Sequence, residues 1–235
     1  MEKAVALVNE WFNDSELDKK VLYAKVEELC NHFNRPAELV CLLTKASNFL
    51  VTRAAKNRDE AEQKRMAFHT FRLGEEALSK GPDSAECHKW YAIAIGGISD
   101  FVPVKEKIRN GSSFKEHVDI AIALAPADAT LHHMLGRFCH QIANLSWIEK
   151  KVASTLFGEV PAATLEDAAR HLTRAYELKR EWKENILYLA KCSFELKQVD
   201  AGRRLVQEGI ELPIRGEDDE ICHKEFLLLK SRYTK

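Results

Sequence analysis

The stretch TLHHMLGRFCHQIANLSWIEKKVASTLFGEVPAATLEDAA, residues 130–169, decides the fold. It opens with a helical pattern that contains the small-residue contact Leu135-Gly136. A long apolar insertion follows, and the stretch ends in the start of a second helix. With its flanks it forms one unit of a helical repeat, and the remaining sequence varies the same unit.

The second helices of the units carry small or apolar residues at a fixed spacing. This spacing is similar to positions 20, 24, 27 and 32 of the 34-residue tetratricopeptide repeat. The four sets are Thr70, Gly74, Ala77 and Pro82; Phe114, Val118, Ala121 and Pro126; Ala168, Leu172 and Ala175 with Arg180 in place of proline; and Ala201, Leu205, Glu208 and Pro213.

Counting on from each turn places the first helix of the next repeat, whose packing residues are at positions 4, 7, 8 and 11. These are Val40, Leu43, Thr44 and Ser47; His88, Tyr91, Ala92 and Ile95; His132, Leu135, Gly136 and Cys139; and Ile186, Leu189, Ala190 and Ser193. A small residue at position 8 lets the two helices of a hairpin approach closely. In the opening repeat we take the frame that begins at Val40, because the rival frame, with Leu42, Lys45, Ala46 and Phe49, would put a charge at packing position 7.

These units predict an all-α fold of tetratricopeptide-like antiparallel hairpins, stacked as a short solenoid. Compared with a standard unit, the links inside the first three hairpins are longer by 14, 10 and 20 residues, and the fourth is one residue short. We therefore expect extended hairpin connections on one edge of the solenoid. The predicted organisation is N-terminal helices over 1–36, helical repeats over 37–213, and a capping helix over 214–235, whose first turn is the acidic run at 217–220.

A second stripe of the first helices, at positions 5, 9 and 12, lines the concave side of such a stack. None of its twelve residues is acidic, although the chain has 35 basic and 36 acidic residues. The stripe predicts a cationic groove for an anionic partner, and a plain solvated face is the alternative. The groove residues are Lys45, Lys89, His133, Arg137, His140 and Lys191. Edge contacts are expected from Lys105, Lys107, Arg109, Lys150 and Lys151.

Three motifs resemble the regulator of microtubule dynamics family: KWYAI at 89–93, FKEHVDIAIALAPADATLHHMLGRFC at 114–139, and NLSWIEKKVASTLFGEVPAATLEDA at 144–168. The resemblance covers about residues 37–212. It implies a tetratricopeptide-like domain that associates with microtubules and the mitotic spindle and acts in chromosome segregation. Some longer relatives carry an N-terminal membrane anchor, work at mitochondrial contact sites, and bind phospholipid through such a domain.

The apolar residues of the insertion have helical spacing, and they include Trp147, Leu156 and Phe157. We expect them to pack over the edge of the hairpin. The alternative is an exposed apolar docking patch.

Composition and motifs exclude several functions. The net charge is −1, so no general attraction to nucleic acid is expected. The six cysteines are scattered, which is typical of reduced thiols in the cytosol. No apolar run reaches the roughly 18 residues of a transmembrane helix, and the N-terminus lacks a signal peptide. Neighbouring pairs such as Cys139-His140 point in different directions on a helix and are not expected to chelate a metal. No phosphate-loop or nucleophile motif appears, so we expect neither an enzyme nor a cofactor.

The leading hypothesis is a non-enzymatic microtubule-associated protein of the cytoplasm, cytoskeleton, spindle and spindle poles, which binds acidic tubulin through the groove. A second hypothesis is a phospholipid module, with Phe194, Leu187 and Ile93 against an acyl chain. A third is a scaffold for an acidic or phosphorylated peptide of a spindle or kinetochore protein.

Overall fold

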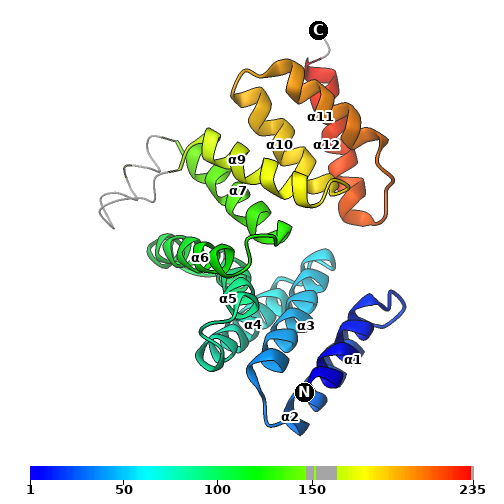
Figure 1. Ribbon diagram of the computed structural model, residues 1–235, viewed down its shortest axis with the longest axis vertical. Helices are drawn as coiled ribbons and strands as arrows, with labels where there is room; N and C mark the ends of the chain where they lie inside the picture. Colours follow the sequence, from blue (N-terminus) through cyan, green and yellow to red (C-terminus); the bar gives the residue numbers. More distant parts are fainter. Residues whose placement is uncertain (147–150, 152–162, 234–235) are drawn as a thin grey trace. The chain divides into compact units, whose positions relative to one another are not determined.

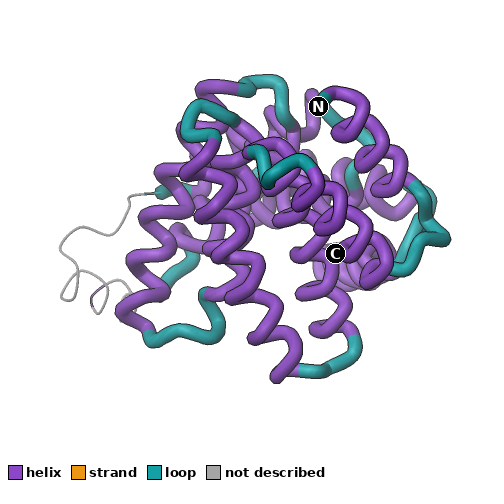
Figure 2. The backbone as a smooth tube through the Cα atoms, turned by 90° about the horizontal axis from the view of Figure 1, so that it is seen from below, coloured by secondary structure: helices purple, strands orange, loops and turns teal. Residues whose placement is uncertain are grey.

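The computed structural model describes residues 1–146, 151 and 163–233. Within these residues the chain forms helices joined by short turns, and no strand occurs (Figures 1 and 2). The prediction of an all-α fold is confirmed. Contacts divide the chain into two compact units, Met1–Leu124 and Ala125–Lys235. The domain boundaries predicted after residues 36 and 213 fall inside these units and stay predictions.

Unit 1 is built from hairpins with one additional pair of helices at its start. Its helices are α1 (Glu2–Asn13), α2 (Lys19–His32), α3 (Ala37–Lys56), α4 (Glu60–Lys80), α5 (Ala85–Ile98) and α6 (Val104–Leu124). Helices α3 and α4 pack as one hairpin and α5 and α6 as the next, while α2 packs on α3. Val8, Leu22 and Val26 of the first two helices are fully buried in the same core as Leu39 and Leu43 of α3.

The turn from α2 to α3 is held in place by an ion pair. Asn34 and Arg35 both have positive φ, at 58° and 54°, which is unusual for residues other than glycine. The Arg35 guanidinium donates from Nε and Nη2 to the two carboxylate oxygens of Glu76 on α4, at 2.8 and 2.6 Å. Lys80 Nζ donates to the Arg35 carbonyl oxygen at 2.6 Å. The strained turn is therefore fixed to α4 by two side chains.

Within the described residues, unit 2 consists of two hairpins and a final helix. Its described helices are α7 (Ala129–Ala143), α9 (Leu165–Leu178), α10 (Lys183–Glu195), α11 (Val199–Glu211) and α12 (Glu217–Tyr233). Helices α7 and α9 pack together, as do α10 and α11, and α12 packs on α10 and α11. The acidic run at 217–220 forms the first turn of α12, as predicted, where negative charge is favourable to the helix dipole.

Burial decides between the two alternative alignments of the first repeat, on α3. Val40, Leu43, Thr44 and Ser47 are all fully buried, whereas Lys45 of the rival frame is only half-buried. The frame beginning at Val40 is confirmed. The hydroxyl of Ser47 lies 2.7 Å from that of Thr70 on α4, so a polar contact joins the two helices inside the core.

The predicted register of the last hairpin is wrong by one residue. Ala201, Leu205 and Glu208 are partly exposed, and the buried residues of α11 are Gly202, Val206 and Gly209. With this correction the hairpin has the standard spacing and is not one residue short.

The close approach of the helices explains the small residues. A Cβ atom on Gly202 would lie 2.7 Å from a ring carbon of Phe194 on α10. A Cβ atom on Gly136 would lie 2.6 Å from Cγ of Leu172, which is fully buried on α9. The small residue predicted at position 8 of α7 therefore packs as expected.

The extra residues of the first two hairpins lengthen the helices. Helices α3 and α4 have 20 and 21 residues, and only Asn57, Arg58 and Asp59 join them. Helix α6 likewise has 21 residues. The extra residues predicted for the connections of these two hairpins therefore form additional turns at the ends of the helices. Trp147, Leu156 and Phe157 of the third insertion lie outside the described residues.

Two histidines at position 4 of successive repeats make the same contact. His88 Nε2 donates to the Pro82 carbonyl oxygen at 2.8 Å, and His132 Nε2 donates to that of Pro126 at 3.0 Å. Both rings are buried. Because a carbonyl only accepts, Nε2 carries a proton in each ring, and His88 Nδ1 lies 2.8 Å from His117 Nδ1 on α6. These histidines connect each turn to the next hairpin.

All six cysteines are buried free thiols, three in each unit. In the part of the chain that the structure describes, no helix combines the length and the apolar character that crossing a membrane requires.

Candidate functional site

The predicted groove residues fall into both units. Lys45 lies on α3 and Lys89 on α5, in unit 1. His133, Arg137 and His140 lie on α7, and Lys191 lies on α10, in unit 2. Each unit therefore has its own group of these side chains.

In unit 2 the four predicted residues gather around one aromatic ring. Tyr188, on α10, was not predicted from the sequence. Its ring centroid lies 4.6 Å from the Arg137 guanidinium carbon and 5.3 Å from Lys191 Nζ. The rings of His140 and His133 meet it edge-on, with centroids 5.8 and 6.2 Å away. We call these five residues the Tyr188 cluster.

Carboxylates from neighbouring positions neutralise much of this charge. Arg137 Nη1 donates to Glu184 Oε1 at 2.6 Å, and His140 Nε2 lies 2.9 Å from Glu195 Oε2. Lys191 Nζ lies 3.1 Å from Glu225 Oε2 on α12. The three glutamates lie outside the stripe at positions 5, 9 and 12. The stripe alone therefore did not reveal the carboxylates that pair with its cations. The cluster thus joins α7 to α10 and α10 to α12 through ion pairs.

His133 faces the core more than the surface. Its side chain is buried, Nδ1 lies 3.0 Å from Asn185 Oδ1, and its ring lies against that of Trp182 with centroids 4.2 Å apart. Its Nε2 is 3.5 Å from Glu184 Oε2. Burial raises the pKa of Glu184, but the contact with His133 and the charge of Arg137 outweigh it, so the net direction is below the ordinary value. Glu184 therefore stays ionised beside the Arg137 guanidinium.

In unit 1, Lys45 and Lys89 are near the same carboxylate. Lys89 forms an ion pair with Glu86, and Trp90 Nε1 donates to the other oxygen of that carboxylate at 3.1 Å. Lys45 Nζ lies 4.0 Å from the ring centroid of Phe12. Partial burial lowers the pKa of Lys45, and the charge of Lys89 acts in the same direction. This pair is thus partly compensated, as in unit 2.

The predicted edge residues are exposed where the structure describes them. Lys105, Lys107 and Arg109 lie in the first turns of α6, and Lys107 Nζ contacts Asp100 Oδ1 at 2.9 Å. Lys151 is exposed, and Lys150 is outside the described residues.

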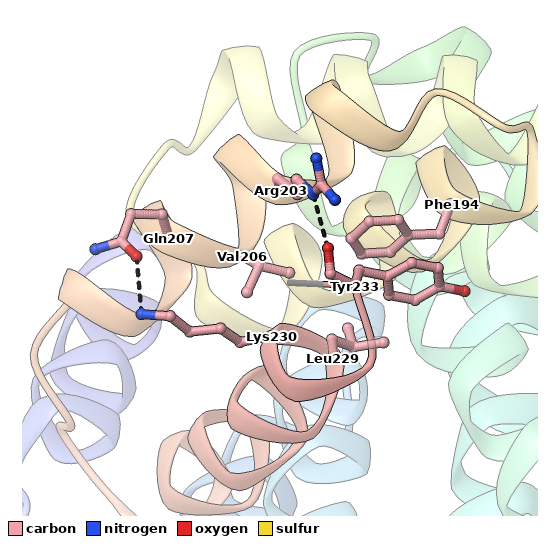
Figure 3. A pocket seen from close by; sticks show the side chains of 7 residues that line it. All are labelled: Phe194, Arg203, Val206, Gln207, Leu229, Lys230 and Tyr233. Carbon is pink, nitrogen blue, oxygen red and sulfur yellow. Dashed lines mark hydrogen bonds between the residues drawn. The ribbon is translucent and has the colours of Figure 1, made fainter. Parts of the chain in front are cut away.

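A pocket of about 490 Å³ lies between α10, α11 and α12 of unit 2, and the sequence did not predict it (Figure 3). Its apolar walls include Phe194 and Tyr233, whose rings stack with centroids 3.7 Å apart. Arg203 Nε donates to the Tyr233 carbonyl oxygen at 2.7 Å, and Lys230 Nζ donates to Gln207 Oε1 at 3.3 Å. Among the described residues that line the pocket, two are cations and none is a carboxylate. Of the residues that line the pocket, the sequence singled out only Phe194, at position 12 of its repeat. Arg203 and Lys230 were not singled out, because they lie on α11 and α12 and not on the first helix of a hairpin.

Comparison with known proteins gives relatives of one family. The family described as regulator of microtubule dynamics proteins 1–3 matches residues 4–234. Regulator of microtubule dynamics protein 2 of Rattus norvegicus is 35% identical over 203 residues, which are 85% of this chain and 48% of the relative. Protein 1 of Caenorhabditis elegans is 39% identical over 158 residues, which are 67% of this chain and 70% of the relative. The chain spans about half the length of the protein 2 relatives that it matches.

Solved structures support the fold. A thermophilic tetratricopeptide protein of Thermus thermophilus aligns with a TM-score of 0.61 at 13% identity, covering 97% of this chain and 98% of that one. PilF of Pseudomonas aeruginosa aligns with a TM-score of 0.58 at 11% identity, covering 99% and 91%. The predicted tetratricopeptide-like architecture is confirmed. At these identities the likeness shows the fold alone.

Proposed function

Because the chain belongs to the regulator of microtubule dynamics family, we propose that it is a microtubule-associated binding module without catalytic activity of its own. The observation that carries this proposal is the family match, which extends over residues 4–234. Spindle organisation and chromosome segregation, with partners at the spindle or kinetochore, are the cellular roles proposed for it.

The Tyr188 cluster is the proposed contact for an acidic segment of tubulin. Arg137 and Lys191 are partly exposed, and each is held by a single carboxylate from the same unit. Exposed ion pairs contribute only about 0–1 kcal/mol each. An incoming acidic segment can therefore compete with Glu184 and Glu225 for these two cations. Several such exchanges must occur together, which favours a partner with closely spaced carboxylates.

Co-sedimentation with microtubules tests this proposal. The test variant is Arg137→Gln with Lys191→Gln. The matched control is Arg170→Gln with Arg174→Gln on α9, which removes two arginines from local ion pairs of the same unit. A charge-swapped variant, Arg137→Glu with Glu184→Arg, keeps the internal pair but moves the cation. Each protein is mixed with intact microtubules and with microtubules whose acidic tails have been removed, at low and high salt.

The proposal expects the parent and the α9 control to bind intact microtubules more strongly than tail-stripped ones, and less at high salt. The test variant and the swapped variant should both bind more weakly. Equal binding of all variants would refute the role of the cluster. Absence of binding by the parent under every condition would refute direct microtubule contact.

The pocket beside Phe194 supports a second candidate function, phospholipid binding. Stacked aromatic walls next to Arg203 and Lys230 suit an acyl chain with a phosphate group. Phe194 and Leu187 are both buried, but only Phe194 is among the residues that line this pocket. Native mass spectrometry with an anionic and a zwitterionic phospholipid tests the proposal. Binding should fall in the Arg203→Gln, Lys230→Gln variant and persist in Arg204→Gln, one residue from the pocket; no bound phospholipid in the parent would end it.

A further inference from the structure

The outer face of α12 has two exposed apolar residues, one on each side of the middle of the helix. Ile221 and Leu228 are 56% and 64% exposed, although they stand one above the other on the helix, seven residues apart. The opposite face holds Cys222 and Phe226, which are buried against the rest of unit 2. Figure 1 shows α12 beside α10 and α11 in this unit. The exposed leucine and isoleucine therefore belong to a face that the described residues leave uncovered.

The residues of this face have the spacing of a helix-pairing seam. Glu217, Ile221, Lys224, Leu228 and Ser231 are separated by four, three, four and three residues, and all are exposed. This is the spacing of the a and d positions of a heptad; here Ile221 and Leu228 are apolar and the other three residues are polar. A second helix is therefore a suitable partner for this face.

Charge along α12 identifies that partner. The first turn contains the four acidic residues 217–220, and the last turn contains Lys230 and Arg232. An identical helix in the antiparallel direction places its basic end against this acidic end. With the midpoint between Lys224 and Glu225, Ile221 faces Leu228 of the second copy, and Glu217 faces its Arg232. From this self-complementarity we propose that the protein forms a homodimer through antiparallel pairing of the outer faces of α12.

The expected dimer is symmetric and of limited strength. Each contact occurs twice around a two-fold axis, as in isologous interfaces. Helix α12 has 17 residues and is about 25 Å long. Pairing of two such helices buries less than the roughly 1,200–2,000 Å² of a standard interface. The association should therefore be reversible and depend on protein concentration. It does not depend on the function proposed above.

Sedimentation velocity of the whole chain, over a hundredfold range of concentration, tests this inference. The variant Ile221→Ser with Leu228→Ser removes both exposed apolar residues of this face, and its folding is checked by circular dichroism. Glu217→Lys and Arg232→Glu are prepared as separate single variants. Arg204→Glu, at an exposed position on α11, serves as the matched control because it changes a charge outside α12.

The parent and the control should shift from monomer to dimer as concentration rises. The double serine variant should stay monomeric. Each charge variant alone should dimerise about tenfold more weakly, since two pairs become repulsive. An equal mixture of the two should recover the parent's association, because lysine at 217 of one chain then meets glutamate at 232 of the other.

Three results would overturn the inference. A parent that remains monomeric throughout excludes the dimer. Dimerisation that survives the double serine substitution assigns the interface to another surface. A mixture that associates no better than the separate charge variants excludes the antiparallel register.

Discussion

The substitution Gly209→Ala tests the closeness of α11 and α12. At Gly209 the backbone of α11 lies against the ring of Phe226, which is fully buried. A Cβ atom there would be 2.2 Å from Cζ and 2.5 Å from two neighbouring ring carbons. Carbon atoms in contact prefer separations of about 3.5–4.0 Å. Either the ring or α12 as a whole must therefore move by more than about 1 Å.

Two opposing effects set the magnitude. Overpacking of a well-packed site reduces the free energy of unfolding by about 1–3 kcal/mol. Replacing glycine by alanine inside a helix raises it by up to about 1 kcal/mol. The net expectation is a loss of up to about 3 kcal/mol, and a loss of about 1–3 kcal/mol relative to the same substitution at a glycine without the clash. Gly96 offers a matched control, because it is also the third residue from the end of its helix but has no atom within 4 Å of an added Cβ.

Urea unfolding followed by circular dichroism measures both substitutions. Gly96→Ala should leave the free energy of unfolding unchanged or raise it, and Gly209→Ala should lower it. Phe226→Leu in the Gly209→Ala background should lose less stability than the two single changes predict together, since the smaller side chain relieves the clash. Equal stability of the two alanine variants, or strict additivity with Phe226→Leu, would refute this account of the packing.

Two other predictions concern buried or paired charges. Lys183 is 2% exposed, and its Nζ donates to the carbonyl oxygens of Gly209 and Leu212, each at 2.7 Å. Lys183→Met leaves both acceptors without this donor and should lower the midpoint of thermal unfolding, by an amount equivalent to about 2–4 kcal/mol; an unchanged midpoint would contradict this role. The guanidinium of Arg35 lowers the pKa of Glu76 from 4.5 to about 2. Because the folded-state pKa is the lower one, the pair stabilises the protein above pH 4.5, and this contribution is lost as the pH falls toward 2. Urea titrations between these pH values should show a steeper loss of stability for the parent than for Glu76→Gln, and parallel curves would contradict it.

The fold was predictable because the small residues recur at the same position of each repeat, and that position is buried. Thr44, Ala92, Gly136 and Ala190 all lie at helix contacts and are buried. The error in the last hairpin arose from using Pro213 to set the register. A proline marks where a helix has ended, whereas burial inside the helix is decided by which residues let another helix approach. Gly202 and Gly209 carried that information in the sequence.

The candidate site was only partly predictable for a different reason. A stripe along one helix brings Arg137 and His140 to one face, and the repeat brings Lys191 near them. The carboxylates of Glu184 and Glu225 reach these cations from other helices and other positions of the repeat. Pairing between helices depends on side-chain direction across a contact, which the period of one helix does not contain. The same limit explains why Tyr188 was missed.

Because all six thiols are buried, their reaction with a reagent reports local unfolding of the helices around them. A thiol-reactive reagent reaches Cys30, Cys41 and Cys87 only when unit 1 loosens, and the other three only when unit 2 does. Mass spectrometry of reagent-treated protein thus distinguishes which half yields first under denaturant. The same protection means that a cysteine introduced on the surface can carry a dye alone, without removing any natural thiol.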